Sequence, residues 1–246
     1  MELNVTGARV FFEVPGLGLR ITETEVVSWL VMAVIAALCY WLTRNLQVRG
    51  VSRRQVVAEL LVKTASDFVK SNMGERFAGF APFIASLFAL SALSSLSSLL
   101  GLYPPTADLS TELGWALLVF VMITYYKVKS SGLGGYLKGF TQPIAVLTPF
   151  NIISEISTPI SMAFRHFGNI ASGTVITALV YGALASLSHL ALSWVPAAFV
   201  REIPLFQLGL PAFLSIYFDL FSGLLQAFIF CMLTMMYVSA AAGESK

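Results

Sequence analysis

The chain has 246 residues, of which 57% are hydrophobic and only 11% are charged, with a formal net charge of +2. A soluble domain typically has about 25% charged residues, so this chain has too few of them to cover a water-facing surface. The composition therefore excludes an ordinary soluble enzyme, and with no basic tract it gives no reason to expect a nucleic-acid partner.

The first apolar run predicts a membrane helix at 26–44, because roughly 20 apolar residues in a helix cross a hydrocarbon core of about 30 Å. The preceding residues 1–25 mix acidic and basic side chains without a basic stretch that leads into an apolar core. A cleaved signal peptide is therefore not expected. Cys39 and Cys231 both lie in apolar runs, where buried free thiols are the ordinary interpretation.

The next segment, 50–76, alternates apolar and charged residues at helical spacing, which predicts an amphipathic helix on a membrane surface. A membrane helix pair is expected at 78–127, interrupted by a loop at 103–111. The Gly-rich stretch 127–149 reads as a second loop. A long helix pair is expected at 149–241, so that 1–246 forms a single all-α membrane domain with about five membrane helices.

The basic residues indicate the orientation of these helices. Segments 44–76 and 127–138 are rich in Lys and Arg, whereas the loop at 103–111 has none. Cytoplasmic loops of membrane proteins carry an excess of basic residues. The N-terminus is therefore expected outside and the C-terminus in the cytoplasm, most naturally in a bacterial inner membrane.

Arg165 is the leading functional candidate, since an arginine at the centre of a membrane helix costs about 2.5–3.5 kcal/mol on insertion scales. It lies on one helical stripe with Thr158, Ser161, Asn169 and Ser172. Such a stripe is typical of a hydrated ion path, and the alternative is polar packing between helices. Arg165 itself could alternatively extend to a membrane interface, or pair with Glu155 or Asp219, in a purely structural role.

The last apolar segment carries a matching stripe of Ser215, Asp219, Ser222 and Gln226. A carboxyl group at Asp219 that takes and gives a proton would suit a proton half-channel. Glu155, ten residues before Arg165, is either an ion-exit group or a charge favoured by a helix N-terminus. His166 is better explained as a packing histidine than as a proton relay. No metal-binding cluster, nucleotide motif or cofactor motif is found.

Two long motifs resemble one family. The string PISMAFRHFGNIASG (159–173) resembles the pattern P-x-S-x-x-x-R-x-F-G-N-x-x-x-G of ATP synthase subunit a, and LLQAFIFCMLTMMYVS (224–239) resembles the motif of its last helix. The likeness covers about residues 70–241.

The resemblance implies a non-catalytic subunit that needs no cofactor and conducts protons, or Na⁺, through two half-channels. It implies a c-ring, a peripheral stalk subunit b and membrane lipid as partners, with the last two helices tilted as a hairpin against the c-ring. Arg165 would be the essential arginine, Asn169 and Gln226 its polar neighbours, Ser161 a path residue and Asp219 an ion-inlet group.

The sequence departs from the family pattern at two positions. His166 stands where Leu is usual, and Thr174 stands where some members have a Glu that partners a last-helix His. Asp219 alone is therefore expected to serve the inlet. The alternatives are a stand-alone secondary ion transporter or channel, a membrane-embedded enzyme without a supporting motif, and a purely structural subunit.

Overall fold

The computed structural model describes residues 7–13, 18, 20–48, 51–193, 206, 213–214 and 216–243, and the side chain of Asp219 lies outside this description. Five helices in the described part are long and apolar enough to cross a membrane: Glu23–Thr43, Glu75–Leu100, Leu109–Gly139, Ala145–Leu192 and Ile216–Ala241. The prediction of an all-α chain with about five membrane helices is confirmed.

The N-terminal part forms a short hairpin and the first membrane helix. Strands β1 (Val10–Glu13) and β2 (Arg20–Thr22) pair antiparallel, a feature that the sequence did not predict. Helix α1 (Glu23–Thr43) begins at a capping box in which the backbone N–H of Thr22 donates to Glu25 Oε2 at 2.7 Å. Cys39 on this helix is exposed, not buried as expected, whereas Cys231 is buried.

Helix α2 (Arg53–Met73) begins at Ser52, whose hydroxyl accepts the Gln55 N–H, and ends at Gly74, whose φ of 89° favours glycine. Its first half exposes Val56, Leu60 and Leu61, and its second half packs into the core. The helix is amphipathic as expected, and its place on a membrane surface stays a prediction.

The next elements form the helix pair around the loop. The 3-10 turn η1 (Glu75–Phe80) leads into α3 (Ala81–Leu96), which ends in the turn η2 (Ser97–Leu100). After the turn η3 (Pro105–Ala107), helix α4 (Leu109–Gly139) begins at Asp108, whose carboxylate accepts the Ser110 N–H at 2.9 Å.

Helix α4 extends far beyond the predicted end of the pair. The sequence predicted a loop over 127–149, but the helix continues to Gly139, with non-helical backbone only at Gly132 (φ 72°, ψ 163°). Because glycine adopts positive φ without steric cost, Gly132 turns the chain and the residues after it return to helix. The loop prediction was therefore wrong for the first part of this stretch.

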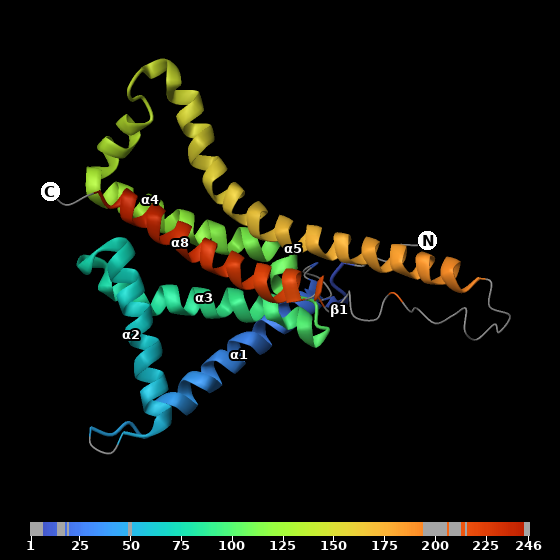
Figure 1. Cartoon of the computed structure of the whole chain (residues 1–246). Helices are drawn as coiled ribbons and strands as arrows, with labels where there is room; N and C mark the ends of the chain where they lie inside the picture. Colours follow the sequence, from blue (N-terminus) through green and yellow to red (C-terminus); the bar gives the residue numbers. More distant parts are fainter. Residues whose placement is uncertain are drawn as a thin grey trace.

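The last two helices carry most of the candidate residues. The turn η4 (Ala145–Leu147) precedes α5 (Thr148–Leu192), a 45-residue helix with Pro159 inside it. Figure 1 shows α5 as one long ribbon that bends in its first half, and an internal proline removes one helical hydrogen bond. The π-helical turn η6 (Ile216–Ser222) leads directly into α8 (Gly223–Ala241).

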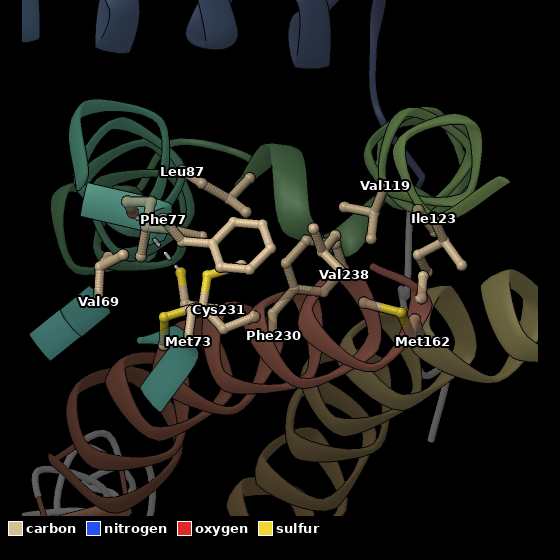
Figure 2. Packing of buried hydrophobic residues seen from close by; sticks show 14 of the residues in the cluster. Val69, Met73, Phe77, Leu87, Val119, Ile123, Met162, Phe230, Cys231 and Val238 are labelled. Carbon is tan, nitrogen blue, oxygen red and sulfur yellow. Dashed lines mark hydrogen bonds between the residues drawn. The ribbon is translucent and has the colours of Figure 1, made fainter. Parts of the chain in front are cut away.

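Helix α8 lies at the centre of the packing, between α3 and α4, and α4 also contacts α5 (Figure 1). The core contains Val69 and Met73 of α2, Val119 of α4, Met162 of α5 and Phe230 of α8, as Figure 2 shows. Burying apolar side chains at these contacts holds the helices in one arrangement. This arrangement positions the polar stripe of α5 against the start of α8.

Candidate ion-conducting site

Arg165 lies on the middle of α5 with its side chain exposed at the surface of the chain. Ile160 and Phe164, on the adjoining side of the helix, are exposed and apolar. Among the described side chains, which exclude that of Asp219, no carboxylate lies within ion-pairing distance of Arg165. The exposed side of α5 therefore presents one cation without a described counter-charge.

The polar stripes of α5 and α8 meet beside this arginine. Asn169 Nδ2 donates to Ser222 Oγ at 2.5 Å, and Gln226 Nε2 donates to the backbone carbonyl of Arg165 at 3.3 Å. Ser222 is buried, whereas Asn169 and Gln226 remain half-buried. The structure thus brings together four of the predicted residues and attaches the arginine-bearing turn of α5 to the first turns of α8.

Two further stripe residues remain at the surface of α5. Ser161 is exposed, and Ser172 is exposed and donates its hydroxyl to the Asn169 carbonyl at 3.1 Å, within the same helix. Both lie on the side of the helix that carries Arg165. The side chain of Asp219, the expected inlet group, lies outside the described residues.

Glu155 lies apart from Arg165, in an ion pair with α4. Lys127 Nζ contacts its two carboxylate oxygens at 2.8 and 2.6 Å, and the Tyr136 hydroxyl lies 3.4 Å from one of them. The side chains of Lys127 and Glu155 are 34% and 17% exposed. The alternative in which Glu155 pairs with Arg165 is therefore not formed, and Glu155 ties α5 to α4.

We expect the charge reversal Lys127→Glu to destabilise the α4–α5 contact by about 1–2 kcal/mol, between the values typical of exposed and buried pairs. The thermal unfolding temperature of the purified protein in detergent should fall accordingly. The exchanged pair, Lys127→Glu with Glu155→Lys, should recover most of the loss. Equal unfolding temperatures for the single and the exchanged variants would contradict this assignment.

Glu112, which lies in the first turn of α4, was not among the site residues predicted from the sequence. Its carboxylate Oε2 lies 3.1 Å from Nδ1 of His166, and the two side chains are 0% and 1% exposed. His166, expected to be a packing residue, is thus buried against a carboxylate. The only sequence signal was an ionisable residue next to an apolar run, and it does not reveal a partner 54 positions away.

Known proteins resemble the chain along most of its length. The family model described as ATP synthase A chain matches residues 25–239. The chain is 31% identical to ATP synthase subunit a of Desulforamulus reducens over 99% of its length and 90% of that relative. It is 35% identical to ATP synthase subunit a of Albidiferax ferrireducens, over 93% of this chain and 90% of the relative.

A further relative bears on the transported ion. A protein of Propionigenium modestum named ATP synthase subunit a, sodium ion specific, is 29% identical over 93% of this chain and 77% of its own length. A family model that covers most of the chain, together with relatives above 30% identity over nearly their whole length, shows the family. This chain belongs to the ATP synthase A chain family, the ion-conducting subunits a of the membrane sector of ATP synthase.

Proposed function

We propose that this chain conducts protons through two half-channels that meet at Arg165, where the chain faces the rotating c-ring of an ATP synthase. Membership of the family makes the chain a multi-pass membrane subunit that translocates ions in the membrane sector of that complex. What we propose beyond this is the route through two half-channels, the proton as the transported ion and the c-ring as the partner. The chain performs no chemistry on ATP and supplies the path by which ion flow becomes rotation.

One observation carries the proposal: α5 exposes Arg165, without a carboxylate partner among the described side chains, while the turns around it are held to α8. An uncompensated cation facing lipid would be unfavourable by several kcal/mol. A partner that presents carboxylates to this face removes that cost. The fixed charge then favours the ionised form of each passing carboxylate and blocks direct proton flow between the half-channels.

The polar residues around the arginine take defined places in this proposal. Asn169, Ser222 and Gln226 form the polar contact with α8, and Ser161 and Ser172 extend the stripe on either side along α5. Asp219 serves the inlet half-channel. Glu155, paired with Lys127, lies towards the outlet, where it can exchange protons only if this pair opens.

The orientation and the other partners follow from the basic segments and the family. The N-terminus lies outside and the C-terminus in the cytoplasm of a bacterial inner membrane, with the basic residues of 44–76 and 127–138 on the cytoplasmic side. A peripheral stalk subunit b holds the chain against rotation. A stand-alone transporter, the alternative considered from sequence, is not favoured by the family.

Cross-linking in the assembled complex tests the c-ring contact. With Cys39 replaced by Ser, Ser161→Cys should form a disulfide with a cysteine placed on the ion-binding helix of the c subunit, because Ser161 is exposed on the face of Arg165. The matched control is Ala163→Cys, whose position is 0% exposed and should not react. Equal cross-linking at both positions, or at neither, would argue against this face as the rotor contact.

A further inference from the structure

The contact between Glu112 and His166 is the most unusual polar feature of the described structure. Both side chains are at most 1% exposed, and they come from different membrane helices, α4 and α5. In the Lys127–Glu155 pair between the same two helices, by contrast, both side chains keep some exposure. Burying ionisable groups in a low-dielectric interior is unfavourable unless they compensate one another.

The chemistry of the pair makes it a binding site for one proton. When one proton is present, it resides on His166 as part of an ion pair or on Glu112 as part of a neutral pair, and the net charge is zero in both forms. Removing it leaves one negative charge. Because the two groups are in contact, the gain or loss of this proton concerns the pair as a unit.

The pair also has atoms available for proton exchange. Among the described residues, neither Oε1 of Glu112 nor Nε2 of His166 has a hydrogen-bond partner. Buried polar atoms in proteins are nearly always partnered, which makes these two atoms exceptional. In a pair that only joins two helices, hydrogen bonds to these two atoms would add stability. In a pair that exchanges protons, the atoms must stay accessible to the incoming and outgoing proton.

The pair lies directly behind Arg165. His166 follows Arg165 in sequence, so the two side chains point about 100° apart around the helix, one outwards and one into the bundle. Arg165 and His166 nevertheless border the same narrow gap between α5 and α8, which Gln226 and Phe230 also line and which has no room for a water molecule. A proton on the pair is therefore one residue away from the proposed rotor contact.

The other end of the pair is close to the loop at 103–108. Glu112 lies in the first turn of α4, and the preceding turn η3 contacts α3, α4 and α5. Thr106 in η3 is fully buried and accepts a hydrogen bond from the Ser95 hydroxyl at 3.2 Å, and the buried hydroxyls of Ser91 and Ser94 lack partners among the described residues. Buried hydroxyls thus lie where α3 meets this loop.

From this geometry we propose that Glu112 and His166 together bind and release the translocated proton between the 103–108 loop and Arg165. The proposal rests on the proposed position of Arg165 beside the path. A proton from the aqueous side of the loop forms one O–H or N–H bond in the pair and cancels its negative charge. That bond breaks when the proton passes to the carboxylate that the partner presents at Arg165, and the pair regains its negative charge.

Other ionisable groups share the elements packed around the pair. Helix α3 carries none, and Arg165 precedes His166 on α5. The remaining ionisable residues of the packed elements are Asp108 before α4, Tyr125, Tyr126, Lys127, Lys129, Tyr136 and Lys138 on α4, Glu155, Tyr181 and His189 on α5, Tyr217 and Asp219 on η6, and Cys231 and Tyr237 on α8. If these residues are kept and only the pair is replaced, a change in the pH dependence of proton conduction can be assigned to the pair.

The test measures passive proton conduction in vesicles that contain the whole complex with its catalytic sector stripped off. The external pH is varied from roughly 5 to 9, a range that surrounds the ordinary pKa of histidine. The variant is Glu112→Leu with His166→Leu, since well-packed apolar residues often replace a buried ion pair without loss of stability. Conduction should fall at least about tenfold, because lost proton-transfer groups typically cost a factor of 100 or more, and its pH profile should lose an inflection.

The control is Thr124→Val, which removes another buried hydroxyl of α4 without a partner among the described residues and should leave conduction within about twofold. Unchanged conduction and pH profile in the assembled double variant would overturn the proposal and leave the pair a structural contact. If Arg165→Ala leaves ATP-driven pumping intact in vesicles that keep the catalytic sector, the proposed function itself fails, which distinguishes the two failures.

Discussion

Replacing Arg165 by Ala should abolish ATP-driven ion pumping in vesicles while the complex stays assembled. The variant lacks the fixed charge on the exposed face of α5, so carboxylates at that face are no longer favoured in the ionised form. The loss cannot arise from failed insertion, because removing a central arginine relieves about 2.5–3.5 kcal/mol on insertion scales. Acidification of the vesicle lumen on addition of ATP, followed with a pH-sensitive dye, measures the effect.

The matched control for this result is Phe164→Leu, which changes the adjacent exposed apolar residue and keeps the charge. It should pump at close to the native rate. Arg165→Lys keeps a positive charge but loses the planar fork of the guanidinium, and its pumping should fall between the native chain and the alanine variant. Undiminished pumping by an assembled Arg165→Ala complex would refute the fixed-charge mechanism.

Gly223→Val should separate α3 from α8 and lower the stability of the chain. A β-carbon at Gly223 would lie 2.9 Å from Cβ of Ser95, which is buried and cannot move aside as a flexible side-chain end can. Overpacking of this kind typically costs about 1–3 kcal/mol, and small residues are what allow membrane helices to approach closely. The unfolding temperature in detergent and the yield of assembled complex should both fall.

The substitution should also disturb ion conduction, since Gly223 follows Ser222, which is joined to Asn169. Gly114→Ala in α4 is the control, because no atom lies within 4 Å of a β-carbon built there. The compensating pair Gly223→Ala with Ser95→Gly moves the β-carbon from one helix to the other and should restore most of the stability. A Gly223→Val chain as stable as the native one would show that this close approach is not required.

Hydropathy was sufficient to predict the five membrane helices, because a run of apolar residues is a local property of the sequence. It failed at the end of α4, where the glycines and lysines of 127–139 looked like a loop. Only Gly132 departs from helical backbone there, and the residues after it return to helix. Composition indicates that a helix can break but does not indicate whether it resumes.

The candidate site was predictable where it follows helical spacing and not where it depends on packing. The spacing placed Arg165 and Asn169 on one stripe, and the structure joins Asn169 to Ser222. Nothing in the sequence assigns Glu112 to His166, because their approach depends on how α4 crosses α5. The pairing of Glu155 with Lys127 was missed for the same reason.

The length of α5 affects where the membrane voltage drops along the ion path. The stretch 160–192 after Pro159 is about 50 Å long at 1.5 Å per residue, so to fit within a hydrocarbon core of about 30 Å it must be inclined by roughly 50°. Each residue then advances only about 0.9 Å in depth. The row from Ser161 to Ser172 therefore runs more along the plane of the membrane than across it. The row spans about 10 Å in depth, so an ion moving along it crosses about a third of a 30 Å core, and the rest of the voltage drop falls on the approaches above and below.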